Sequence, residues 1–529
     1  MDQFSEAQAP RDPVRGIRYR LLSGIGAQSF AQLLRIGQQF IIVPLFIHAW
    51  GSAAYQDWLV IFSATTFLIL LDLGTVVYFG NRMLFLWSRG ATQDFDHTIK
   101  LAIGSLAALL LAAALVLTPI ALTVDWKAAL GIHELPSSAL NLALLFFALS
   151  AVPRIFFILL LTIYTARGEL HRSNNAWSTY FIAQTVAVVI ALAFKASILQ
   201  VAFVMMVSDF LAALLAAADQ YHRYKGMRFA VGLPSRAELA DIASNSPFYL
   251  VNPLTVLALL HGPIVILGAL GSVPGAVVTF SVLRTLTGLA RQLPFQLAIG
   301  FGVEMARHSA RQDPVTLRKI YINAGRFVSG LIGLLGGMLL VVAEPFVQLW
   351  THNQVTYDGT LVLMFIAATI CAGPAQPAMA VLTYSNRPRP VALALLCQCA
   401  AGLALCAAVT PRFGAHGAQA SLWLTEFMAV GLCLPYAASR KIGVPFASYL
   451  IQSYGAGILA FGTSYLIAHG LASVFGISGF LGLVEVGAAW GAAVAAIAAI
   501  AFYLLRARRS PVLGNGPARI RHHPSGLNT

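Results

Sequence analysis

The chain has 529 residues, of which 58% are hydrophobic and 10% are charged, and its mean hydropathy is +0.76. A soluble fold of this size cannot bury so much apolar surface and still cover itself with so few charges, and a disordered chain would be far less hydrophobic. The composition therefore excludes a soluble enzyme. It indicates an all-α polytopic membrane protein, because a helix satisfies its own backbone hydrogen bonds in lipid.

The net charge of +14 comes from 34 Lys and Arg against 20 Asp and Glu. In a membrane protein such an excess indicates basic cytoplasmic loops, so the bilayer is the expected partner and nucleic acid is not. The five cysteines lie in apolar stretches without the spacing of metal ligands. We therefore expect no metal and no cofactor.

The first apolar stretch follows a basic segment, 1–21, and lacks the small-residue cleavage site of a signal peptide, so it is predicted to be a transmembrane helix. A hydropathy window of about 19 residues predicts about fourteen spans along the chain. The predicted spans are 22–48, 55–79, 101–124, 140–165, 177–194, 198–218, 246–270, 275–305, 322–343, 360–384, 391–409, 416–437, 450–470 and 483–505.

The basic residues of the loops lie almost entirely on one side of these spans. That side, with both termini, carries 26 Lys and Arg, whereas the alternate loops carry Lys127, Lys195 and Arg412. The positive-inside rule places both termini in the cytoplasm. In the longest cytoplasmic loop, Ser235 and Glu238 form a capping-box pattern that predicts a short surface helix. The tail, 506–529, is basic and predicted to be disordered.

The two halves of the chain resemble each other. Several short segments recur in the same order at an offset of 220 or 217 residues. The matched segments are Gly51-Ser52 with Gly271-Ser272, Gly80 with Gly300, Tyr164-Thr165-Ala166-Arg167 with Tyr384-Ser385-Asn386-Arg387, Lys195 with Arg412, and Ser208-Asp209-Phe210 with Thr425-Glu426-Phe427.

The repeat predicts the domain organisation. An N-lobe at 22–218 and a C-lobe at 246–437 hold six spans each, are joined by a cytoplasmic linker at 219–245, and are followed by two extra helices at 450–505. Because the first span of each copy starts on the same side, these are parallel repeats, related by an axis along the membrane normal. Secondary transporters built in this way enclose a central cavity between their lobes.

Two short motifs in the first two spans suggest a family. The segment from Trp50 to Trp58, WGSAAYQDW, followed by Leu70-Leu71-Asp72-Leu73-Gly74, resembles polysaccharide-biosynthesis flippases of the MOP superfamily, which includes MATE exporters and lipid II flippases, and in particular the Wzx-type O-antigen translocases. Asp57 stands where a second glycine is common in those proteins.

The resemblance implies a function and a location. It implies two helical bundles that move an undecaprenyl-pyrophosphate-linked oligosaccharide across the bacterial inner membrane, for surface polysaccharide or lipopolysaccharide biosynthesis. Other polysaccharide-assembly proteins are further expected partners. In the lipid II flippase branch, an Asp at the start of helix 2 and an Arg in helix 8 are functionally prominent, and Asp57 and Arg284 correspond to them.

Charged side chains are costly in the bilayer centre and usually face a cavity or a partner. Arg35 shares one helical face with Gln28, Gln32 and Gln39, and such a polar face is too costly to turn toward lipid. Arg284 and Arg291 are two turns apart on one face, with Gly288 between them. We expect a substrate site for the pyrophosphate, whose predicted residues are Gln32, Arg35, Gln39, Arg154, Arg284 and Arg291. Snorkelling or pairing within the bundle is the alternative.

Asp209 and Glu426 occupy matched positions in the repeat, and Asp57 lies near the outer end of the second span. A buried carboxylate can carry a proton or coordinate Na⁺, so these three residues are the candidates for coupling to H⁺ or Na⁺. A salt bridge to a nearby arginine is the alternative for each. Asp72 is expected to be structural.

Two other functions stay open. A MATE-like exporter of organic cations would need acids and aromatic residues in its cavity, whereas this chain has more arginines than acids within its spans. An integral membrane enzyme of the same pathway would need an external catalytic loop, and the external loops are short. No Walker A pattern occurs, so direct use of ATP is not expected.

Overall fold

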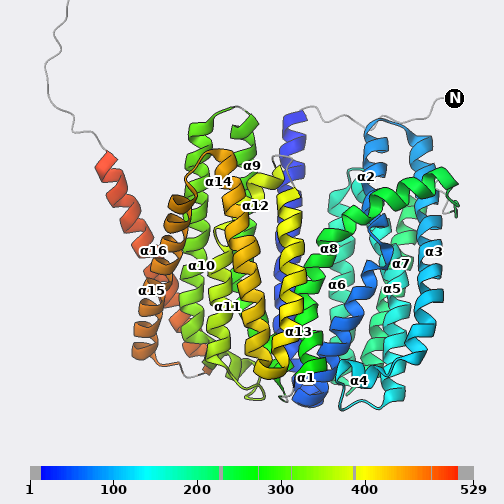
Figure 1. The fold of residues 1–529 in the computed structure, drawn as a ribbon, viewed down its shortest axis with the longest axis horizontal. Coiled ribbons are helices and arrows are strands. Elements are labelled where there is room, and N and C mark those ends of the chain that lie inside the picture. The colour runs from blue at the N-terminus through cyan, green and yellow to red at the C-terminus, as the bar shows by residue number, and fades with distance from the viewer. Residues whose placement is uncertain are drawn as a thin grey trace, which may run out of the picture. The chain divides into compact units, whose positions relative to one another are not determined.

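All regular secondary structure described in the computed structural model is helical (Figure 1). The structure describes the backbone of residues 13–224, 230–271, 273, 275–310, 312–384, 389–477 and 479–509. Side chains are described within these ranges except at 13–36, 39, 299, 303, 306, 307, 310, 384, 498 and 501–509. The predicted N-terminal basic segment and C-terminal tail therefore lie largely outside the described residues.

The described part of the chain divides into two compact units. The first unit ends at Tyr465, and the second begins at Leu466. The first unit holds fourteen α-helices, a 3₁₀-helix and a π-helix, together with the start of a further helix. In order, these are α1 (Pro13–Thr66), η1 (Phe67–Asp72), α2 (Thr75–Ser88), α3 (Thr92–Thr123), α4 (Trp126–Leu130), α5 (Ser137–Ala166), α6 (Leu170–Ala193), α7 (Ile198–Arg223), α8 (Arg236–Leu270), α9 (Ala276–Ala310), α10 (Pro314–Trp350), α11 (Gly359–Ala372), α12 (Ala375–Tyr384), α13 (Arg389–Glu426), η2 (Phe427–Leu432), α14 (Cys433–Ile442) and α15 (Phe446–Phe475).

The second unit contains the end of α15 and α16 (Gly479–Arg509). The two helices are joined at Gly476, whose φ of 68° lies in the left-handed region that glycine tolerates. Within this unit Ala468 and Val486 are fully buried. These helices correspond to most of the two extra spans predicted at 450–505.

Ten of the described helical segments are long and apolar enough to cross a membrane, and the bent pair α11–α12 makes an eleventh. Two of the ten contain a break that the hydropathy pattern had placed between separate spans. α1 is non-helical at Gly51 (φ 78°, ψ 171°) and α13 at Gly414 (φ 53°, ψ −136°). Both α1 and α13 turn back on themselves within their length (Figure 1). A multi-pass helical membrane protein is therefore confirmed, while the count of fourteen spans and the repeat layout stay predictions.

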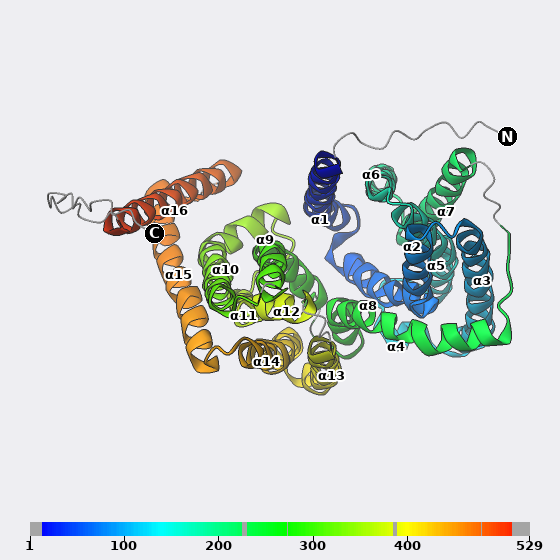
Figure 2. The ribbon, with the colours of Figure 1, turned by 90° about the horizontal axis from the view of Figure 1, so that it is seen from above.

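Within the first unit the helices form two bundles, with α1 and α8 between them (Figures 1 and 2). We call α2–α7 the N-terminal bundle and α9–α14 the C-terminal bundle. The end of the first unit at which α1 turns back is called the Gly51 end.

The surface helix predicted in the linker is not a separate element. The capping box is present, because Ser235 Oγ accepts from the Glu238 N–H and the Glu238 carboxylate accepts from the Ser235 N–H. The helix that it starts continues without interruption as α8. The sequence after Glu238 contains no glycine until Gly262, and the three prolines that follow Glu238 lie inside α8 without ending it.

Glycines allow α8, and the segment of chain that precedes it, to lie directly against the N-terminal bundle. A Cβ at Gly104 of α3 would lie 1.9 Å from the carbonyl oxygen of Gly232, whose N–H donates to Lys100 O at 2.9 Å. A Cβ at Gly74 would lie 2.4 Å from Ser246 O of α8. Only glycine permits such backbone-to-backbone packing.

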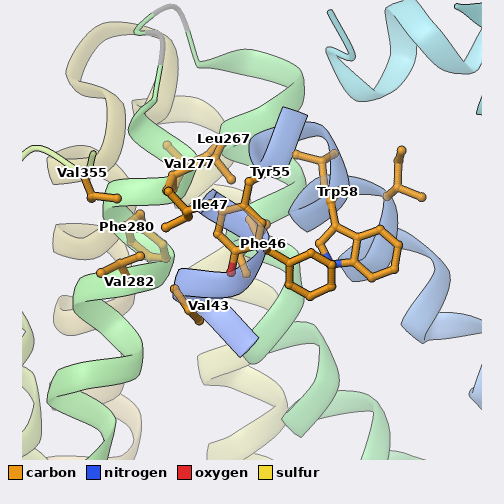
Figure 3. Packing of buried hydrophobic residues seen from close by; sticks show 14 of the residues in the cluster. Val43, Phe46, Ile47, Tyr55, Trp58, Leu267, Val277, Phe280, Val282 and Val355 are labelled. Carbon is orange, nitrogen blue, oxygen red and sulfur yellow. The ribbon is translucent and has the colours of Figure 1, made fainter. Parts of the chain in front are cut away.

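The hydrophobic core is shared at one end of the first unit and divided at the other. At the Gly51 end, a single cluster joins both bundles and includes Ile47 and Trp58 of α1, Leu267 of α8 and Phe280 of α9 (Figure 3). Toward the opposite end, the N-terminal bundle and the C-terminal bundle have separate clusters. Apolar burial therefore holds the two bundles together mainly at the Gly51 end.

Candidate functional site

One face of α9 carries two arginines with open space between them. Ser281, Arg284, Gly288 and Arg291 are spaced at three and four residues, so they follow one another along that face. A Cβ at Gly288 would have no neighbouring atom within 4 Å. The structure therefore leaves room beside the two guanidinium groups, as their spacing had suggested.

Arg284 donates to the backbone of α8 just before Pro263. Its Nη1 donates to Leu260 O and its Nη2 donates to Leu259 O, each at 2.8 Å. The Leu259 carbonyl would normally accept from the residue four positions later, but that residue is Pro263, which has no N–H. Two of the five donors of the Arg284 guanidinium thus have a structural role, and the others are left for further partners.

Arg291 forms a two-pronged ion pair with Glu426 of α13. Both Nη atoms contact the carboxylate, with Nη1 to Oε2 at 3.2 Å and a shorter contact between Nη2 and Oε1. The Glu426 side chain is 8% exposed, whereas that of Arg291 is 36% exposed. The Arg291 guanidinium also lies over the Phe295 ring, 4.8 Å from its centroid. The structure therefore brings together a predicted substrate residue and a predicted coupling residue.

The part of α8 next to Arg284 also contacts α1. The Nδ1 atom of His261 is 3.2 Å from Ser63 Oγ, and the His261 ring packs edge-on against Phe62. The charged face of α9 is thus connected through α8 to the second half of α1. The polar face predicted on the first half of α1, Gln28, Gln32, Arg35 and Gln39, lies outside the described side chains.

Asp209 and Arg154 belong to a second polar cluster inside the N-terminal bundle. Asp209 of α7 accepts from Ser150 Oγ of α5 at 2.5 Å and from the Tyr180 hydroxyl of α6 at 2.6 Å. Arg154 interacts electrostatically with Asp209. Among the described side chains, Arg154 Nε is a buried donor without a hydrogen-bond partner. Tyr180 also lines a cavity of about 560 Å³ between α5, α6 and α7.

Ser150 and Tyr180 were not predicted from the sequence as parts of this cluster. Ser150 lies one turn before Arg154 on the same face of α5, and this spacing could have indicated that the two side chains share a polar site. Tyr180 comes from a different helix, and nothing in its local sequence indicates a partner on α7. Asp209 and Glu426 occupy matched positions in the sequence repeat, yet their hydrogen-bond partners differ: two hydroxyls bind Asp209, whereas an arginine binds Glu426. Each acid interacts with an arginine, Asp209 with Arg154 and Glu426 with Arg291.

Asp57 and Asp72 bind backbone N–H groups. Asp57 is buried and accepts from the N–H groups of three successive residues, His133, Glu134 and Leu135, at 2.8–3.2 Å. Asp72 accepts from the N–H groups of Gly74 and Val76 at the start of α2. Asp57 thus anchors the loop before α5, and Asp72 has the structural position that its motif suggested.

Comparisons with known proteins give a fold. No protein-family model matches the chain, and no curated protein matches it in sequence. Among solved structures, the lipid II flippase MurJ in an inward closed conformation has a TM-score of 0.67 at 14% identity, over 91% of this chain and 99% of that chain. An inward-facing MATE multidrug-resistance transporter of the MOP superfamily has a TM-score of 0.62 at 11% identity, over 78% and 94% of the two chains.

An outward-facing MATE transporter of the same superfamily matches with a TM-score of 0.51 at 12% identity, over 80% of this chain and 94% of that chain. All three neighbours are membrane transporters or flippases rather than enzymes. At these identities the likeness concerns the fold alone. The chain is a multi-pass helical membrane protein with the fold of MOP-superfamily transporters.

Proposed function

We propose that this protein is a flippase that moves an undecaprenyl-pyrophosphate-linked saccharide from the inner to the outer leaflet of a bacterial inner membrane, with both termini in the cytoplasm. The observation that carries this proposal is the open space at Gly288, flanked by Arg284 and Arg291 on one face of α9. Guanidinium groups suit a diphosphate because they bind its oxygens in a planar fork and stay charged when partly desolvated.

The extent of the structural likeness supports a flippase over a MATE-like exporter. The MurJ alignment leaves 9% of this chain uncovered, which is fewer residues than α15 and α16 together contain. Part of these two last helices therefore has a counterpart in the flippase. The MATE alignments leave 20–22% of this chain uncovered.

The charges near the site also favour an anionic substrate. The acid next to the α9 face, Glu426, is already paired with Arg291, and Arg284 donates instead to the backbone carbonyls of Leu259 and Leu260. An organic cation placed at Gly288 would lie among two arginines and one glutamate, where the net charge is positive. A lipid-linked pyrophosphate would instead neutralise that charge.

The shared core at the Gly51 end supports an alternating-access mechanism. If the loops at that end face outward, as the charge pattern predicts, the two bundles are joined on the outer side and have separate cores on the cytoplasmic side. A substrate would then enter between the bundles from the cytoplasmic leaflet. Coupling to H⁺ or Na⁺ would use Asp209, which lies beside a cavity within the N-terminal bundle.

The test is reconstitution of the full chain in proteoliposomes with a fluorescent undecaprenyl-pyrophosphate-linked saccharide in one leaflet. We expect the protein to expose the label to a membrane-impermeant quencher, and Arg284→Ala to abolish this at unchanged protein content. Transport of organic cations with no movement of the lipid would replace the proposal with the MATE-like exporter. Movement that is unaffected by alanine at both Arg284 and Arg291 would place the site elsewhere.

A further inference from the structure

The geometry points to Glu426 as an internal counter-ion that occupies Arg291 when no substrate is bound and that the anionic head group of the substrate displaces. This inference rests on the proposed flippase function and deepens it. It assigns Glu426 a role in release and specificity, in place of the ion-coupling role predicted from its position in the repeat.

The ion pair has the geometry of a bound anion. The carboxylate of Glu426 engages both Nη atoms of Arg291, which is the arrangement that a phosphate would adopt on the same fork. The Phe295 ring beneath the guanidinium holds it in place through a cation–π contact. Arg291 is therefore pre-oriented for an oxyanion, and Glu426 provides one from within the protein.

The burial of the two partners differs in a way that suits exchange. Glu426 is nearly buried, whereas about a third of the Arg291 side chain is exposed. The open space at Gly288 lies one turn away, on the same face as Arg291. An anion that enters this space can reach the exposed part of the Arg291 guanidinium before Glu426 leaves. The exchange would therefore never leave the Arg291 charge partly buried without a counter-ion.

The surrounding charges favour the exchange. Arg284 interacts electrostatically with both Arg291 and Glu426, so the empty site holds two positive charges and one negative charge. Glu426 also interacts electrostatically with the thiol of Cys371 on α11. A diphosphate would outcompete a single carboxylate because it brings more negative charge to the same pair of arginines.

An internal counter-ion of this kind would speed the release of the substrate from the arginines. Two arginines in a partly dehydrated site would hold a diphosphate tightly, and tight binding slows dissociation. A carboxylate tethered beside Arg291 rebinds as soon as the substrate moves away, and so favours departure. The Glu426 carboxylate also lowers the net positive charge of the site, so the site repels cationic ligands less than two arginines alone would. Neutralising Glu426 should therefore increase the preference of the site for anions over cations.

The experiment uses the purified full chain in detergent and farnesyl pyrophosphate as a soluble polyprenyl diphosphate probe, with affinity measured by calorimetry. Glu426→Gln removes the charge and keeps the size of the side chain. We expect it to bind the probe about tenfold more tightly, because a charge-assisted competitor has been removed. We expect the same variant to slow lipid translocation at saturating substrate, because release becomes limiting. Glu344→Gln, the same change on α10, should alter neither value.

A second variant guards against misfolding. Glu426→Asp keeps the charge but shortens its reach, and it should fall between the wild type and Glu426→Gln in affinity. Probe affinity that is unchanged or weaker in folded Glu426→Gln would overturn the inference and make Glu426 a structural partner. Because the probe assay does not require translocation, a wild-type protein that binds farnesyl pyrophosphate but moves no lipid-linked saccharide would instead contradict the proposed function alone.

Discussion

The guanidinium of Arg284 takes the place of the backbone N–H that Pro263 lacks. Pro263 leaves the Leu259 carbonyl without its helical donor, and Arg284 Nη2 donates to that oxygen at 2.8 Å. The arginine expected to bind substrate is thus also part of the scaffold that shapes α8. Alanine substitution alone would confuse these two roles, so they have to be separated by a second change.

We predict that Arg284→Ala lowers the free energy of unfolding by about 1–3 kcal/mol, because it leaves the Leu259 carbonyl without a donor and removes a second hydrogen bond to the Leu260 carbonyl. Adding Pro263→Ala should recover part of this loss, because the new N–H can donate to Leu259 O. Transport should stay absent in the double variant, since the guanidinium is missing. Thermal unfolding in detergent and the quencher assay measure the two effects. Additive losses of stability would show that the two residues are not coupled.

Asp57 gives a second case in which stability and coupling can be told apart. Asp57→Asn should lower the free energy of unfolding by about 1.5–3 kcal/mol, because three N–H groups lose a charged acceptor. Asp125→Asn, at the exposed cap of α4, should cost about 1 kcal/mol or less. Full stability of Asp57→Asn together with lost transport would favour the ion-coupling role over the anchoring role.

The packing of α1 against α8 at the Gly51 end depends on Gly268. A Cβ there would lie 2.5 Å from Val60 Cγ2, so Gly268→Ala should push α8 away from α1 at a cost of about 1–3 kcal/mol. In a chain whose five cysteines are replaced by alanine, a cysteine at the buried position Ile132 should then react several-fold faster with an impermeant maleimide. Gly455→Ala, where an added Cβ meets no atom within 4 Å, is the control and should leave labelling unchanged.

Ion coupling through Asp209 is also testable. Asp209→Asn keeps the size of the side chain and one acceptor oxygen, but removes the negative charge near Arg154. We expect translocation to lose its dependence on an imposed H⁺ or Na⁺ gradient, while Tyr180→Phe weakens that dependence only in part. The measurement is the initial rate in proteoliposomes with and without the gradient. A gradient response that survives Asp209→Asn would remove Asp209 from the coupling mechanism.

The orientation can be checked independently of transport. The excess of Lys and Arg in the loops on one side of the predicted spans predicts that both termini are cytoplasmic. Reporter fusions at Arg508 and in the loop at 125–138 should therefore report opposite sides of the membrane. Activity of both reporters on the same side would contradict the predicted topology.

The sequence by itself determined the class of the protein and much of its local structure. Hydropathy alone identified a multi-pass helical membrane protein, because apolar length is a local property of the chain. The capping box at Ser235 and the structural role of Asp72 were also predictable, since their partners are two to four residues away. The spacing of Arg284, Gly288 and Arg291 correctly placed all three on one face of a helix.

Only the tertiary structure decided what those charged residues contact. Arg291 meets Glu426 across 135 residues of chain. Pro263 marks the Leu259 carbonyl as an acceptor without a helical donor, but nothing in the sequence shows that Arg284 of α9 is the group that fills its place. The matched positions of Asp209 and Glu426 did not predict matched partners, because each pairing depends on which neighbouring helix faces the carboxylate. Helix periodicity fixes the direction of a side chain relative to its own axis, whereas its partner is fixed by how separate helices pack.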